Sequence, residues 1–303
     1  MSHTPFIRCR AAIVALVAGL AAGALAIPVA ETAAGTAQAA HATAFGTRVA
    51  HIGPSNAEPV KAVAVKCPEG TWPYAAGGAV NYEQAGNGGA ALTAIVPGVE
   101  AGAVLVTAAA PQGLTANWSL VAFAVCSSNM QPVLVVGKGI GTARAACPGD
   151  QGLVGVGFHV AGDPTISHIA GVDINPHVTA VEVTAGGPGG AEAEVTALAV
   201  CRLGVVSSQL EHASNDGAGW PKFVSRQDDN EDLRPWATGA KVTGPAEATL
   251  DAIVPAGDDG VSWARGTLFG GYAPPAAFAS EDEDDDDGDG SLTLETGLIG
   301  TFH

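Results

Sequence analysis

The sequence predicts an all-β fold of tandem β-sheet units packed as a sandwich or a prism, behind an N-terminal signal peptide. Three observations support this prediction. Short runs rich in Val and Ala are bounded by Gly, Pro and Asn, which is typical of strands and turns. A block with a cysteine near each end occurs twice. Beyond the first segment, no stretch shows the 3.6-residue periodicity of an amphipathic helix.

The chain of 303 residues combines a low charge content with strong acidity. Only 14% of its residues are charged, yet the formal net charge is −17. An ordinary soluble domain carries about 25% charged residues. A chain this rich in Val, Leu and Ile is not globally disordered. The acidic balance excludes a general nucleic-acid binder, because that function needs clustered Lys and Arg.

Residues 1–39 are interpreted as a secretory signal. Arg8 and Arg10 form a basic start, an apolar stretch follows, and Ala37-Gln38-Ala39 is a small-residue cleavage motif. A retained membrane anchor is the alternative, but the Gly and Pro residues in the stretch make it a poor span. We therefore expect a secreted, extracellular protein with no stable membrane anchor after signal cleavage.

The clearest pattern in the chain is internal repetition, which indicates a repeat architecture. A Cys-Pro motif at Cys67 and an Ala-Val-Cys motif that ends at Cys126 recur at Cys147 and Cys201. The two intervals have similar lengths. They define two tandem units of the same construction.

A third unit is visible without its cysteines. Residues 250–255 (LDAIVP) closely copy residues 92–97 (LTAIVP). The predicted organisation is therefore a signal peptide 1–39, an N-terminal extension 40–59, β repeat unit one 60–130, β repeat unit two 131–203, a polar linker 204–233, and a degenerate β unit three 234–303 with an acidic insertion 281–290.

The strands of unit one can be placed from its apolar runs. In the last of them, Trp118 and Leu120 share one face with Cys126, while Val121 and Phe123 share the other, because side chains alternate across a strand. Both faces are apolar, so we expect a central strand that is buried on both sides. The expected strands are 61–67, 74–82, 91–96, 103–109 and 118–126.

Cleavage of the signal removes Cys9 and leaves four cysteines. An even number in an exported protein favours disulfides. None of the cysteines has the close C-x2-C spacing that a zinc site needs. Their repeated placement favours the disulfides Cys67–Cys126 and Cys147–Cys201, each within one unit. The alternative, Cys126–Cys147 with Cys67–Cys201, would join the two units to each other.

The repeated pattern combines C-P-x-G, a Gly-Gly-Ala-Val segment, a Leu-x-x-Ile-x-Pro strand and the closing N-W-S-L-x-A-F-A-V-C. It resembles uncharacterised exported tandem-repeat proteins of high-GC Gram-positive bacteria, which have one cysteine pair per unit. The resemblance is strongest at Asn117-Trp118-Ser119-Leu120. Unit two departs from it at Ala193, where the Trp would fall, and unit three lacks both cysteines. The resemblance implies an exported all-β repeat protein and implies no catalytic residues.

Three histidines of unit two recur at intervals of nine residues: His159, His168 and His177, with Asp163 and Asp173 between them. A metal site would need these side chains to converge from neighbouring strands. The plainer interpretation is that they lie on different faces as ordinary polar residues. An extracellular hydrolase with its site near these histidines is an alternative function.

The simplest interpretation of the acidic run 281–290 is a solvated loop whose like charges repel each other. Asp285, Asp287 and Asp289 alternate before a Gly, as the first ligands of a calcium loop do. The position that such a loop gives to its last ligand is occupied by Thr296. The alternative interpretation is that these three aspartates bind calcium, although the last ligand is missing. We expect no other cofactor.

No G-x-S-x-G, H-E-x-x-H or P-loop motif occurs in the chain. We therefore favour a protein that is not an enzyme: an exported β-repeat protein that binds a cell-wall or extracellular polymer. Repeats present an extended surface that suits such a partner. A structural protein of the extracellular matrix is a further alternative.

Overall fold

The computed structural model describes residues 46–82, 89–111, 113–128, 130–217, 220–227, 234–256, 260–269 and 290–301. All of them belong to one compact unit, Ala37–His303. The expected signal peptide lies outside the described residues. The described part contains strands and one short 3-10 helix, η2 (Gly190–Glu192), and no α-helix, so the predicted all-β fold is confirmed.

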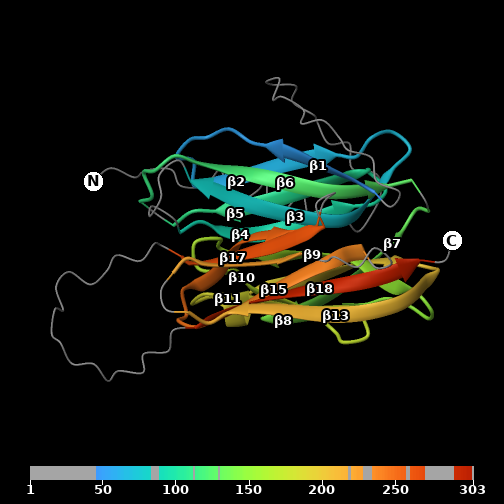
Figure 1. Cartoon of the computed structure of the whole chain (residues 1–303). Helices are drawn as coiled ribbons and strands as arrows, with labels where there is room; N and C mark the ends of the chain where they lie inside the picture. The colour runs from blue at the N-terminus through green and yellow to red at the C-terminus, as the bar shows by residue number, and fades with distance from the viewer. Residues whose placement is uncertain are drawn as a thin grey trace, which may run out of the picture. The chain divides into compact units, whose positions relative to one another are not determined.

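Each repeat unit contains six strands. Figure 1 shows the chain running from the blue strands of unit one to the red strand at the end of unit three. Unit one has β1 (Thr47–Ile52), β2 (Val60–Lys66), β3 (Trp72–Tyr82), β4 (Ala91–Gly98), β5 (Ala103–Ala109) and β6 (Trp118–Ser127). Unit two has β7 (Val133–Ile140), β8 (Thr142–Ala146), β9 (Gly152–Ala161), β10 (His168–Ile174), β11 (Ala180–Gly186) and β12 (Glu194–Arg202). Unit three has β13 (Val205–Asn215), β14 (Lys222–Gln227), β15 (Arg234–Thr243), β16 (Ala248–Val254), β17 (Val261–Leu268) and β18 (Ser291–Thr301).

Two segments differ from the expected organisation. The N-terminal extension 40–59 contains β1, which pairs with β6 and so completes unit one. The expected polar linker 204–233 contains β13 and β14, which pair with β18 and β17. β14 is an edge strand whose polar residues lie on both faces: Lys222 and Val224 are buried, whereas Phe223 and Ser225 are exposed.

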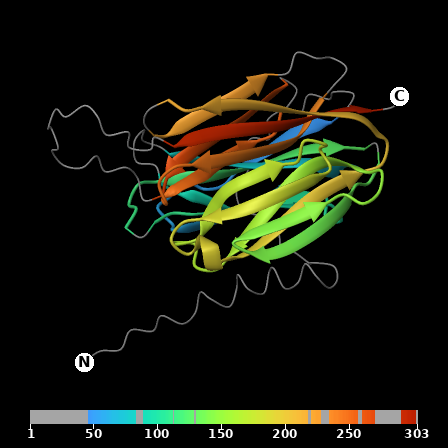
Figure 2. The ribbon, with the colours of Figure 1, turned by 90° about the horizontal axis from the view of Figure 1, so that it is seen from below.

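The strands form three antiparallel sheets of six strands, and each sheet is shared by two units. We name them sheet A (β1-β6-β3-β16-β17-β14), sheet B (β2-β5-β4-β9-β12-β7) and sheet C (β13-β18-β15-β10-β11-β8). Figure 2 shows the yellow strands of unit two beside the orange and red strands of unit three. Unit three pairs back onto unit one, so the exchange of strands closes into a ring. Three antiparallel sheets that share one core agree with the predicted packing of β-sheet units as a sandwich or a prism.

Three seams join the units, one in the middle of each sheet. In sheet A, β3 meets β16; in sheet B, β9 meets β4; and in sheet C, β15 meets β10. Each seam is short, because only two residue pairs are in register across it. These pairs are Ala79↔Ala252 and Gly78↔Ile253, Ala94↔His159 and Ile95↔Phe158, and Gly171↔Lys241 and Val172↔Ala240.

A glycine lies at the same place in each seam: Gly77, Gly157 and Gly239. A Cβ at Gly239 would overlap the carbonyl oxygen of Val172, and Cβ atoms at the other two would press on the equivalent carbonyls. Only a residue without a side chain permits this approach of the two backbones.

The core runs continuously through all three sheets. The strand that follows the Cys-Pro turn, or its counterpart in unit three, carries a β-bulge in every unit, at Tyr74, Val154 and Trp236. All three bulged residues are buried. The rings of Tyr74 and Trp236 lie 4.9 Å apart, centroid to centroid. Large side chains from different units therefore fill the same core, which compensates for the low aromatic content of the chain.

The disulfides are Cys67–Cys126 and Cys147–Cys201, one within each of the first two units. This is the pairing that the repeated placement of the cysteines favours, and not the alternative that would join the units. In unit three, Leu298 occupies the register position of Cys126 and Cys201. That unit is held by strand pairing and packing instead.

Candidate functional site

The outer faces of the three sheets differ in chemistry at equivalent positions. One row of outward-facing residues crosses each sheet at the level of its seam glycine, and we call it the seam row. The seam rows are Ala50, Phe123, Gly77, Val254, Trp263 and Ser225 in sheet A; Val136, Leu198, Gly157, Val96, Leu105 and Ala64 in sheet B; and His212, Glu295, Gly239, Asp173, Glu182 and Arg144 in sheet C. The same place in the fold is therefore aromatic in sheet A, aliphatic in sheet B and charged in sheet C.

Two aromatic side chains cover the seam of sheet A from opposite sides. Phe123 on β6 and Trp263 on β17 pack against Ala79, Ala252 and Val254, which are at most 2% exposed. Phe123 and Trp263 themselves remain partly exposed. The small residues of the seam are thus buried beneath the two larger aromatic side chains.

The apolar surface of sheet A continues beyond this pair to both edges. Phe223 on β14 is 51% exposed, and its ring centroid lies 5.6 Å from that of Trp263. At the opposite edge, Ile52 on β1 is 61% exposed and pairs in register with Val121. We call this surface the aromatic strip. Its members are Ile52, Val121, Phe123, Val254, Trp263 and Phe223.

An internal ion pair borders the aromatic strip. The Nε of Arg265 lies 2.9 Å from Oδ1 and 3.0 Å from Oδ2 of Asp251, and Nη2 of Arg265 donates a hydrogen bond to the Val80 carbonyl. Asp251 is only 1% exposed. Burial raises the pKa of Asp251 to about 6, against the opposing effect of Arg265. The two charges neutralise each other, so this ion pair places no unpaired charge next to the aromatic strip.

The charged seam of sheet C is held by paired groups. Lys241 Nζ lies 3.2 Å from Asp173 Oδ1, and the Ile174 amide donates a hydrogen bond of 2.5 Å to Glu295 Oε2. His212 Nδ1 lies 3.7 Å from Glu295 Oε1. Burial raises the pKa of Glu295, and the nearby Asp173 charge adds to this. Within the described residues, no group of three His, Cys, Asp or Glu side chains could hold a metal ion. The Lys241–Asp173 and Ile174–Glu295 contacts join units two and three, whereas His212–Glu295 lies within unit three.

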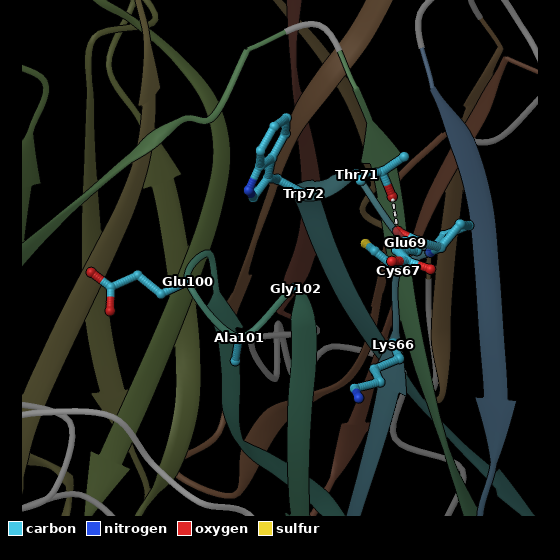
Figure 3. Close-up of a pocket in the computed structure, with 10 residues that line it drawn as sticks. Lys66, Cys67, Glu69, Thr71, Trp72, Glu100, Ala101 and Gly102 are labelled. Atoms are coloured by element: carbon cyan, nitrogen blue, oxygen red, sulfur yellow. Dashed lines mark hydrogen bonds between the residues drawn. The ribbon is translucent and has the colours of Figure 1, made fainter.

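A shallow hollow of about 470 Å³ lies beside the disulfide of unit one, between the turn at residues 67–72 and the turn at residues 100–102 (Figure 3). Both turns are fixed: the Cys67 amide donates to the Gly102 carbonyl over 2.8 Å, and Thr71 Oγ1 donates to Pro68. Figure 3 shows that Trp72, Glu100 and Lys66 point in different directions around Gly102. The polar groups do not converge, so the hollow has no focused ligand site.

The three histidines of unit two do not come together. His159 lies on the outer face of sheet B, opposite Ala94 and Thr196. His168 is fully buried at the start of β10 and stacks on Phe269 with 5.1 Å between centroids. His177 is exposed in the turn that follows β10. The last two therefore lie at opposite ends of one strand, which is why the nine-residue interval creates no shared site.

The expected calcium ligands Asp285, Asp287 and Asp289 lie outside the described residues, so that site stays a prediction. Thr296, at the position of the last ligand, lies in β18. Its hydroxyl is buried and lies 3.0 Å from the Ser262 hydroxyl. The Thr296 hydroxyl is thus engaged in a hydrogen bond with β17.

Sequence reasoning missed the aromatic strip, because its parts come from units one and three. The closing strand of unit one revealed Phe123 as a residue of a second apolar face. Nothing in the sequence pattern, however, places Phe123 across a seam from Trp263.

No protein-family model matches this chain, and no curated protein matches it significantly. Within the described residues, no helix has the length and apolar character needed to cross a membrane. The two disulfides fit an oxidising compartment such as the extracellular space.

Proposed function

We propose that this chain is an exported, non-enzymatic β-repeat protein that binds an extracellular polymer, such as a cell-wall glycan, through the aromatic strip of sheet A. The observation that supports the proposal is the gathering of Phe123, Trp263 and Phe223 on one outer face. At the corresponding positions, sheet B carries aliphatic residues and sheet C carries charged ones.

Aromatic side chains suit this role for two physical reasons. They offer a large, rigid contact area at a low cost in conformational entropy. The flat apolar face of an aromatic ring can also pack against the apolar face of a sugar ring. The strip crosses the sheet from β1 to β14, so an extended partner would contact several strands at once. The exposed or partly exposed members of the strip are Ile52, Phe123, Trp263 and Phe223, whereas Val121 and Val254 are buried. Exposed apolar side chains gathered on one face mark an interaction site.

Electrostatics favour an uncharged polymer over an acidic one. The chain has a net charge of −17, so it repels polyanions. The carboxylate of Asp251, next to the strip, is already paired with Arg265. A neutral glycan would meet neither repulsion nor an unpaired buried charge.

Co-sedimentation of the full exported chain with insoluble neutral glycans and with purified cell wall tests the proposal. We expect Phe223→Ser to weaken binding by about tenfold, because one aromatic contact is worth about 1 kcal/mol or more. Phe223 lies on an edge strand and is half exposed, so its loss should leave the fold intact.

Val60→Ser is the matched control, since Val60 is 40% exposed on β2, an edge strand of sheet B. It should bind as the wild type does. Absence of binding by the wild type, or equal binding by wild type and Phe223→Ser, would reject the proposal.

A further inference from the structure

We propose that the edge strand β7 pairs with β7 of a second copy of this chain, so that two copies of sheet B form one continuous antiparallel sheet. This interface does not involve the aromatic strip. It is therefore independent of the proposed function.

β7 is hydrogen-bonded on one side only. It pairs with β12 over eight register positions, from Val133↔Cys201 to Ile140↔Glu194, and it ends sheet B. Its other side presents backbone N–H and C=O groups that no described strand pairs with. Such an edge is a template for another strand.

The neighbouring strand β8 does not cover this edge. A Cβ on Gly137 would overlap the carbonyl of Arg144, and a Cβ on Gly139 would overlap that of Thr142. Because a Cβ points out of the plane of its sheet, β8 must lie against the face of β7. The hydrogen-bonding edge of β7 is left open by β8.

β7 also lacks the usual protection of an edge. Three of its large apolar side chains are half exposed or more: Val133 at 50%, Val136 at 52% and Ile140 at 66%. Its one charged residue is Lys138, whose Nζ lies 3.8 Å from Glu194. Natural edge strands are normally blunted by charges or proline, so an apolar edge of this length fits a partner strand.

A second copy is the occupant that the sequence of β7 suits best. The chain is strongly acidic, but residues 133–140 contain no acid and one base, so repulsion between copies is weakest there. If a twofold axis through Gly137 relates the two antiparallel β7 strands, Lys138 lies opposite Val136 of the other copy and Ile140 lies opposite Leu134. The two lysines are then not opposed, and the apolar residues meet, as a self-complementary interface requires.

Sedimentation velocity of the full exported chain over a wide concentration range at physiological salt tests the proposal. We expect a reversible dimer with a dissociation constant on the order of 10 µM, because the interface is a single strand pair. Val136→Lys should raise that constant by about tenfold or more, since it adds a second charge to the edge.

Ile52→Lys is the control, because Ile52 is 61% exposed on the edge strand β1 of another sheet. It should dimerise as the wild type does. Ile140→Lys repeats the test at the other end of β7, and circular dichroism checks the fold of each variant. A wild type that stays monomeric at the highest concentration would overturn the proposal. A dimer that persists in both β7 variants would overturn it too.

Discussion

Arg265 on β17 holds both carboxylate oxygens of Asp251 on β16 through its Nε, and Asp251 occupies a β-bulge. The equivalent bulges in units one and two carry the uncharged residues Thr93 and Ala170. The ion pair is thus peculiar to the seam between units one and three. A buried pair of this kind makes stability depend on pH.

Asp251→Asn should change the pH dependence of stability. The pKa of Asp251 is raised from 3.8 to about 6 in the folded chain, so the native state retains a proton that the unfolded state has lost. Asp251 therefore makes the free energy of unfolding fall as pH rises from about 4 to about 6. The variant should lack this contribution. Urea denaturation at several pH values measures it, and an unchanged pH profile would contradict the prediction.

His168→Leu should have the opposite effect. Burial lowers the pKa of His168 from 6.5 to about 4, an effect that the nearby Ala248 backbone only partly opposes. The unfolded chain takes up a proton first as pH falls, so the contribution of His168 to stability is lost on acidification from about 6.5 to about 4. In the wild type the effects of His168 and Asp251 oppose each other, and loss of His168 leaves that of Asp251 unopposed. The His168 variant should therefore become less stable as pH rises through this range, which the same titration detects.

Each disulfide should contribute similarly to stability. The cross-links close loops with sequence separations of 59 and 54 residues. Loops of this length are worth about 4 kcal/mol in the chain-entropy model. The double variants Cys67→Ala/Cys126→Ala and Cys147→Ala/Cys201→Ala should each lose about that much in the free energy of unfolding. A loss below about 1 kcal/mol would show that packing alone holds the units.

Alanine at a seam glycine should damage the fold severely. Gly239→Ala would set a Cβ into the Val172 carbonyl, and a backbone atom cannot move aside as a flexible side chain can. We expect a loss of about 3 kcal/mol, the upper part of the usual range for overpacking, measured by thermal unfolding. Gly217→Ala is the control, because its Cβ would meet only the end of the Asn215 side chain. A stable Gly239→Ala chain would mean that the seam can open without cost.

The sequence predicts the strands well where apolar runs are bounded by turns. In unit one, the five expected strands correspond to β2 through β6, and LDAIVP correctly marks β16. β13 and β14 escaped detection because polar residues interrupt their apolar residues, on both faces in the case of β14. Their composition therefore resembles that of a linker.

The partners of the strands are not visible in the sequence. A unit with six strands gives no sign that three of them join one neighbour and three join the other. For the same reason the aromatic strip is hidden, since Phe123 and Trp263 meet only through the pairing of β3 with β16. Local pattern fixes which residues are extended, whereas packing decides which of them become neighbours.

The ring of exchanged strands has a consequence for the order of folding. A chain that leaves the cell N-terminus first delivers β3 long before β16, so sheet A cannot be completed until most of unit three has emerged. Pairing between segments so distant in sequence is slow, because loop closure must come first. Unit one therefore lacks its partner strands in sheet A until unit three is present. The cross-link between Cys67 and Cys126 can form in that interval, because both cysteines belong to unit one.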